Sequence, residues 1–169
     1  KEKGKPYSVR PKISIEDNLQ SRSYQTFNTN SEDDFIESRK IMFLNDDMTI
    51  GIATPKKSMT DYFFKNADAD EMIFVHKGSG VLKSMYGSIE FEYGDYIIIP
   101  RGTVYQFLFN NEDNHLLIVE SHGPIETPER YRNKYGQFLE HSPFCERDFK
   151  LPVNLETHNE HGEFLINIK

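Results

Sequence analysis

Short runs of apolar and β-branched residues follow one another from about residue 40 onward, and polar or glycine-containing turns separate them. Such runs, with no helical periodicity between them, are typical of β-strands. Turn-forming residues fill the breaks, as in Asn45-Asp46-Asp47 and Pro100-Arg101-Gly102. Regularly spaced short strands predict an all-β sandwich or barrel. The expected strands are Ile41–Leu44, Met48–Ala53, Tyr62–Phe64, Glu71–His76, Gly80–Tyr86, Ser88–Tyr93, Tyr96–Ile99, Val104–Phe109 and Leu116–Glu120.

Two of these runs are apolar on both faces, whereas a strand with one face in water alternates apolar and polar residues. They are Met72-Ile73-Phe74-Val75 and Val104–Phe109. We expect one face of each strand to fill the interior of the barrel. The other face is then expected to lie against further protein.

The segments before and after the strand-rich region differ from it in their pattern of apolar and polar residues. Residues 1–35 are polar, and we expect them to form an arm that is ordered against a partner surface. The barrel should occupy residues 36–125. In residues 126–169, Thr127-Pro128-Glu129 predicts the start of a short helix, with Thr127 as its N-cap. A tail follows, and Glu163–Ile168 is expected to be a final strand.

Composition and charge narrow the range of functions that this protein could have. The formal net charge of −7 and the scattered basic residues argue against nucleic-acid binding, which needs a basic face. No apolar stretch approaches the roughly 20 residues that a membrane span needs. Because Cys145 is the only cysteine, no internal disulfide can form, and we expect a cytoplasmic protein. The sequence begins Lys1-Glu2-Lys3 without methionine, so we expect the natural N-terminus to be missing.

The segment from Glu71 to Gly102 carries spacings that are typical of the two cupin motifs. Glu71 and Gly78 are seven residues apart, as are the Glu and Gly of the first motif. Gly94, Pro100 and Gly102 have the spacing of the second motif. The glycines and the proline shape turns, and turns set strand register. We therefore expect a cupin-like jelly-roll barrel of the RmlC-like kind.

The metal-ligand positions of those motifs hold other residues. Counting back from Glu71, the two histidine positions are Lys65 and Ala67, and the histidine of the second motif is Tyr105. A first-row metal in this fold needs imidazole and carboxylate donors that converge from neighbouring strands. The sequence therefore predicts a metal-free barrel.

Several of these residues allow two interpretations. Glu71 could bind a ligand, but we expect a carboxylate at the barrel rim that pairs with Lys65 or with water. Tyr105 could be an acid or a hydrogen-bond partner for a substrate. We expect it instead to fill the core together with Phe107 and Phe109. Arg101 could bind a carboxylate, but a solvated turn residue is the expected case.

The histidines and the cysteine give weaker signals. His115 and His122 are seven residues apart, so on one straight strand they would point to opposite faces. His76 stands alone at a strand end. His158 and His161 lie among Glu156, Glu160 and Glu163, but Asn159 and Gly162 mark that segment as a solvated turn. Cys145 has no base near it in the sequence, which argues against a nucleophile.

Three stretches resemble homogentisate 1,2-dioxygenases, especially those of bacteria: NADADEMIFVHKGSG (66–80), GDYIIIPRGTVYQF (94–107) and RYRNKYGQFLEHSPFCERDF (130–149). The resemblance implies an Fe(II) enzyme of tyrosine and phenylalanine breakdown that inserts O2 into homogentisate and yields 4-maleylacetoacetate. It also implies that the iron ligands lie in a C-terminal domain that this chain lacks, and that the front barrel is metal-free. We therefore expect no catalytic, cofactor-binding or metal-ligating residues in this chain. The resemblance further implies that this front barrel packs on the catalytic half and helps to assemble trimers, which pair into hexamers.

Three hypotheses follow. The chain is the inactive N-terminal part of a homogentisate dioxygenase, or it is a stand-alone cupin module that binds a small organic ligand in an emptied barrel. The third is an enzyme with a relocated metal site at His158 and His161. An open polar cavity around Glu71 and Tyr105 would favour the second hypothesis, and metal analysis would test the third.

Overall fold

The computed structural model describes residues 13–15, 20–30, 32–152 and 155–169, and the first twelve residues of the expected arm lie outside this range. All the expected strands form within it, with bounds shifted by a few residues at most ends. The strands are β1 (Arg39–Leu44), β2 (Met48–Ala53), β3 (Phe63–Lys65), β4 (Asp70–Lys77), β5 (Gly80–Ser84), β6 (Gly87–Phe91), β7 (Tyr96–Ile99), β8 (Val104–Phe109), β9 (His115–Ser121) and β10 (Ile166–Ile168). Three short 3-10 helices are η1 (Thr26–Asn28), η2 (Glu129–Tyr131) and η3 (Glu146–Asp148).

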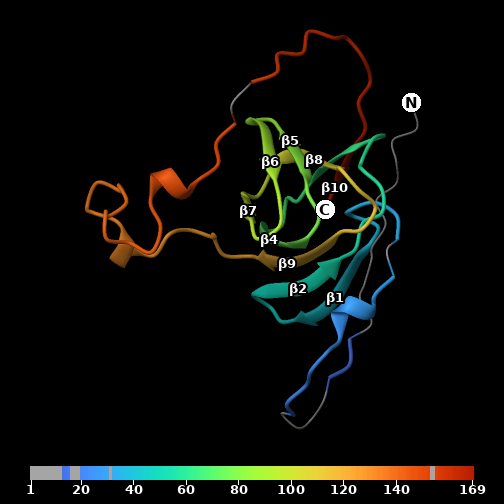
Figure 1. Cartoon of the computed structure of the whole chain (residues 1–169), viewed down its shortest axis with the longest axis horizontal. Coiled ribbons are helices and arrows are strands. Elements are labelled where there is room, and N and C mark those ends of the chain that lie inside the picture. The colour runs from blue at the N-terminus through green and yellow to red at the C-terminus, as the bar shows by residue number, and fades with distance from the viewer. Residues whose placement is uncertain (1–12, 16–19, 31, 153–154) are drawn as a thin grey trace.

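The strands form two five-stranded sheets, with the orders β1-β2-β9-β4-β7 and β10-β3-β8-β5-β6. Figure 1 shows the sheets folded around a common interior, as in a jelly roll. Neighbours far apart in the sequence pair antiparallel, for example β4 with β9 and β5 with β8. The described residues therefore have the all-β architecture that the strand spacing predicts.

The core lies between the two sheets because side chains alternate between the faces of each strand. In β4, Glu71, Ile73 and Val75 are fully buried, whereas Met72 and Phe74 are half-buried on the outer face. The two apolar faces expected for this strand are present. Aromatic rings fill the middle of the interior: Phe35, Phe64, Phe91, Tyr105 and Phe107.

The segment before the barrel packs on the outer face of the first sheet. The Phe27 ring stacks on His115 at 4.8 Å between centroids and meets the edge of His76 at 4.7 Å. Tyr24 contacts Phe43 of β1 at 5.3 Å. Phe35, the last residue of the expected arm, is fully buried in the core. These parts of the segment therefore lie against the barrel itself.

The C-terminal region projects from the barrel and then returns to it (Figure 1). The helix expected at Thr127 is one 3-10 turn, η2, and its N-cap is Pro128 without a side-chain hydrogen bond, so the expected Thr127 cap is wrong. The extended backbone at Arg132 ends the turn. The strand expected at Glu163–Ile168 is confirmed over Ile166–Ile168, where it pairs parallel with β3.

Candidate functional site

A cluster of polar side chains lies in the barrel interior, where the strands of both sheets converge. Glu71 of β4 is fully buried, and its Oε1 accepts a hydrogen bond from Arg39 Nη1 at 2.7 Å. The Tyr105 hydroxyl of β8 donates to Glu71 Oε2 at 2.7 Å. Arg39 Nη2 donates to that hydroxyl at 3.0 Å. Three strands thus contribute an acid, a phenol and a guanidinium that are joined by hydrogen bonds.

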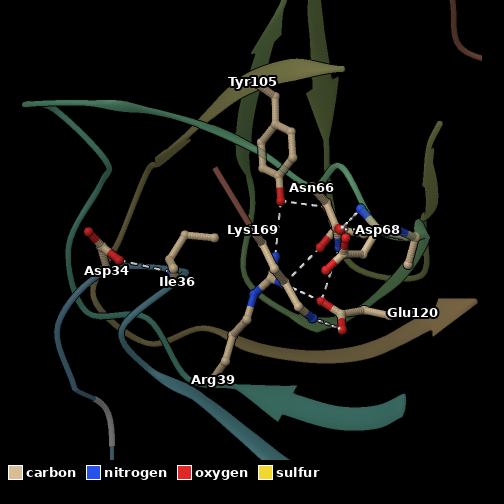
Figure 2. A network of polar contacts seen from close by, with 10 residues as sticks. Asp34, Ile36, Arg39, Asn66, Asp68, Tyr105, Glu120 and Lys169 are labelled. Carbon is tan, nitrogen blue, oxygen red and sulfur yellow. Dashed lines mark hydrogen bonds and ion pairs between the residues drawn. The ribbon is translucent and has the colours of Figure 1, made fainter. Parts of the chain in front are cut away.

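A second carboxylate extends the cluster toward the end of the barrel. Arg39 Nη1 also donates to Glu120 Oε1 of β9 at 2.9 Å, so a single nitrogen bridges two acids. Glu120 also accepts hydrogen bonds from Asn66 Nδ2 at 3.3 Å and from Lys169 Nζ. Figure 2 shows these side chains of Arg39, Asn66, Tyr105, Glu120 and Lys169 pointing toward one another.

The guanidinium of Arg39 is also packed between aromatic rings. Its Cζ lies 4.4 Å from the centroid of Phe35 and 5.4 Å from that of Phe64, within the range of cation–π attraction. Burial lowers the pKa of Arg39, but attraction to the neighbouring acids and phenol outweighs that effect and raises it overall. The group therefore stays charged, and its two carboxylate partners offset the cost of burial.

Burial also controls the protonation of Tyr105. It raises the pKa of this phenol well above its usual value, and the attraction of Arg39 offsets only part of the rise. The neutral hydroxyl can therefore act as donor to Glu71 and as acceptor from Arg39 at the same time. Glu71, Tyr105 and Arg39 therefore form a closed ring of three hydrogen bonds.

The structure corrects the expected surroundings of Glu71. The acid is an interior residue rather than a rim carboxylate, and its partners are Arg39 and Tyr105 instead of Lys65 or water. The expectation for Tyr105 is confirmed, because it is fully buried next to Phe107 in the core. Phe109 is half-buried and continues the same row of rings.

The two residues counted as histidine equivalents also lie elsewhere than expected. Lys65 is half-buried and pairs with Val104, and Ala67 is exposed. Their neighbours Phe64 and Asn66 are the buried residues, so the interior positions are one residue earlier. A one-residue shift reverses the face of every side chain on a strand. Because Phe64 has no donor atom and Asn66 has only an amide, this arrangement does not fit a first-row metal.

The remaining titratable candidates are spread over the molecular surface. Arg101 is an exposed turn residue, as expected, and its guanidinium donates to the carbonyl oxygen of His122 at 2.8 Å. His158 lies 3.4 Å from Glu156 and 3.6 Å from Glu160, and all three are exposed. Across the ranges that the structure describes, no three His, Cys, Asp or Glu side chains are grouped so that they could hold a metal ion.

The expectation that His76 stands alone is wrong. Its ring centroid is 5.9 Å from that of His115, and Phe27 contacts both rings. His115 is buried, and its Nε2 lies 3.1 Å from the carbonyl oxygen of Thr26. A surface cavity of about 470 Å³ lies here between the arm and the sheet. The two histidines meet because β4 pairs with β9, and sequence spacing could not show that pairing.

Cys145 belongs to a small aromatic lobe. Its backbone N–H donates to the Asp148 carboxylate at 2.8 Å, which caps η3. Four rings pack together around this turn: Tyr131, Phe138, Phe144 and Phe149. The unusual 130–149 stretch therefore has its own local packing outside the barrel.

Reasoning from the sequence missed four members of the polar cluster: Arg39, Asn66, Glu120 and Lys169. One signal was present, because Glu120 follows Leu116 and Ile118 at the spacing that puts all three on the inner face of β9. A charged residue at such a position is costly unless it is paired. The identity of its partners required the tertiary structure.

The fold and the retained turn spacings define the class of protein as a cupin jelly-roll barrel. Among solved structures, the cupin domain of Schizosaccharomyces pombe Cnp3 matches with a TM-score of 0.51 and 11% identity, over 59% of this chain and 72% of that one. This likeness concerns the fold. No helix among the described residues is long and apolar enough to cross a membrane.

Sequence comparison assigns the chain to one family within this fold class. The family model described as homogentisate 1,2-dioxygenase N-terminal matches residues 17–169, so the chain belongs to that family. A protein of Saccharolobus solfataricus named as a dioxygenase is 42% identical over 139 residues, which are 82% of this chain and 35% of that protein. The homogentisate 1,2-dioxygenase of Bradyrhizobium diazoefficiens is 35% identical over 98 residues, 57% of this chain and 21% of that enzyme. The chain thus spans about a third or less of the curated relatives it matches.

Proposed function

We propose that this chain is the non-catalytic N-terminal portion of a homogentisate 1,2-dioxygenase. In this proposal, polypeptide outside residues 1–169 holds the Fe(II) and cleaves homogentisate with O2 to 4-maleylacetoacetate, in the breakdown of tyrosine and phenylalanine. The family match and the short span relative to the longer dioxygenases support this role. The single cysteine supports a cytoplasmic location.

The observation that carries the proposal is the filled interior of the barrel. Non-haem Fe(II) oxygenases need two histidines and a carboxylate with open positions for substrate and O2. In this barrel, both oxygens of the Glu71 carboxylate accept hydrogen bonds, one from Arg39 and the other from Tyr105. Phe64 and Phe107 fill the space beside it. No histidine lies in this cluster, so this chain supplies a scaffold and leaves the iron chemistry to other residues.

The same filled interior argues against the stand-alone ligand-binding module. That hypothesis needs an open polar cavity around Glu71 and Tyr105, and both residues are fully buried. Phe107 is also fully buried and belongs to the same core cluster as Tyr105. The described residues therefore favour a structural role over ligand storage.

The outer face of the first sheet supports a role in docking and assembly. Large apolar patches on a protein surface mark interaction sites. On this face, Tyr96, Ile98 and Leu117 are exposed, and Met72, Phe74 and Val119 beside them are half-buried. We propose that the catalytic portion packs on this face and that this contact helps to assemble trimers, which pair into hexamers.

Oxygen uptake tests the catalytic part of the proposal. We expect no consumption of O2 above that of the protein-free mixture when this chain is mixed with Fe(II) and homogentisate, and faster consumption by the longer protein under the same conditions. In the longer protein, Tyr105→Phe should leave the iron content and kcat unchanged, because this phenol touches no iron ligand. Turnover by residues 1–169 alone would contradict the proposal.

Light scattering tests the assembly part. In the longer protein, Ile98→Lys should reduce the trimer and hexamer populations, because it places a charge in the apolar contact. Met85→Lys is the matched control, since Met85 is also apolar and exposed (63%, against 44% for Ile98) but lies in the turn between β5 and β6. Equal behaviour of the two variants would argue against docking on this face.

A further inference from the structure

We propose that the guanidinium of Arg39 takes the place of the metal ion of metal-binding cupins and supplies the positive charge that such an ion would supply. This inference rests on the cupin fold and the buried cluster, and it does not depend on the proposed dioxygenase function. Glu71 and Tyr105 stand at the motif positions of a carboxylate ligand and a histidine ligand. Arg39 is hydrogen-bonded to both side chains, and therefore lies where ligands at these positions converge.

The bonding pattern of Arg39 is that of a bridging cation. One nitrogen, Nη1, contacts an oxygen of Glu71 at 2.7 Å and an oxygen of Glu120 at 2.9 Å. Two carboxylates in a protein interior repel each other and are costly to bury unless a positive charge lies between them. With Lys169 on the other oxygen of Glu120, the cluster contains two acids and two bases and is formally neutral.

A second observation supports a requirement for positive charge, in addition to shape, at the position of Arg39. The Nε of Arg39 is buried without a hydrogen-bond partner among the described residues. The guanidinium is therefore held through its two terminal nitrogens and by the rings of Phe35 and Phe64, a setting that selects a cation. Unlike a bound ion, a guanidinium on β1 cannot dissociate, and it ties β1 to β4, β8 and β9.

A double-mutant cycle between Arg39 and Glu71 tests this inference through protein stability. Arg39→Met leaves two acids and one base, and it should raise the unfolding equilibrium constant about a hundredfold or more, as is usual when one partner of a buried ion pair is removed. Arg39→Met combined with Glu71→Gln restores neutrality. We expect the double variant to unfold at least tenfold less readily than Arg39→Met alone.

The control cycle uses Arg132 and Glu126, whose side chains form an ion pair of 3.0 Å nearer the surface. Arg132→Met and Glu126→Gln should be close to neutral and additive, as is usual for exposed pairs. Additive losses in the Arg39 and Glu71 cycle would overturn the inference, because they would show that Arg39 acts only through its volume. If Arg39→Met does not fold, recovery of a folded protein by adding Glu71→Gln supports the inference, and failure to recover one overturns it.

Chemical rescue asks directly whether the position accepts a free cation. Arg39→Ala removes the equivalent of ethylguanidinium, and the 15% exposure of the Arg39 side chain indicates a route from solvent. Millimolar ethylguanidinium should raise the melting temperature of folded Arg39→Ala in a saturable way. The wild type and Arg39→Ala with Glu71→Gln should not respond. Equal responses of all three proteins, or none in Arg39→Ala, would overturn the inference.

Discussion

Replacing Phe107 by alanine is the most direct test of whether the barrel interior is filled. Phe107 is fully buried, and its ring lies 4.4 Å from that of Phe35, 5.5 Å from Phe91 and 5.6 Å from Tyr105, measured between centroids. Phe→Ala changes at closely packed sites cost about 3–5 kcal/mol, from lost transfer free energy and from the cavity left behind. Because the surrounding rings come from three separate parts of the chain, the segment before β1, β6 and β8, we expect little collapse and a loss near the upper end of that range.

The assay for Phe107→Ala is equilibrium urea unfolding followed by circular dichroism. We expect a lower midpoint with an unchanged slope, since the surface exposed on unfolding stays nearly the same. The loss would be a large part of the 5–15 kcal/mol that typical domains possess. The new cavity should also bind a small apolar probe such as benzene, as other dry apolar cavities do.

Phe27→Ala is the control, because the Phe27 ring is 64% exposed on the arm. It should cost about 1 kcal/mol or less, in line with changes at mostly exposed positions. A loss below about 1 kcal/mol for Phe107→Ala would refute the reasoning. It would mean that the interior is loosely packed, and it would revive the hypothesis of a ligand-binding barrel.

Three further predictions concern a turn, the tyrosines and metals. Gly78→Ala should destabilise by about 1–3 kcal/mol in urea unfolding, because Gly78 has φ +111° and a Cβ there would lie 2.1 Å from Asn114 Oδ1. Burial raises the pKa of Tyr62 and Tyr105, and for Tyr62 the hydrogen bond to a carboxylate adds to the rise. Because unfolded tyrosine ionises near pH 10, this contribution to stability should be complete below about pH 9 and decline as the pH rises further. Tyr105→Phe should make that alkaline decline shallower, and an unchanged decline would contradict the assignment. Treatment with EDTA should leave the melting temperature unchanged, since Arg39 supplies the interior charge, and a fall in that temperature would argue for a structural metal.

The strands and turns of this protein could be predicted from the sequence because their signals are local. The bounds of Met48–Ala53, Tyr96–Ile99 and Val104–Phe109 agree in prediction and structure. Alternation of side chains and glycine-containing turns act over a few residues, so they can be read along the chain. Gly78 and Gly94 have positive φ values, as their turn positions suggest.

Local patterns were less successful where the face of a side chain depended on register. Spacing placed Lys65 and Ala67 at the ligand positions, whereas Phe64 and Asn66 are buried there. A spacer one residue longer before Glu71 is enough to exchange the two faces. Nothing in the composition of this segment distinguishes the two registers, and the choice is made by the pairing of β3 with β8.

The chemistry of the interior was decided by tertiary structure alone. Arg39 is 32 residues from Glu71 and 81 from Glu120, and β10 joins β3 from the far end of the chain. Local propensity has no information about which distant charges meet, because that depends on the closure of the two sheets around one interior. The sequence predicted that other residues replace the histidine ligands of the cupin motifs, and only the folded barrel showed that a guanidinium lies between the two acids.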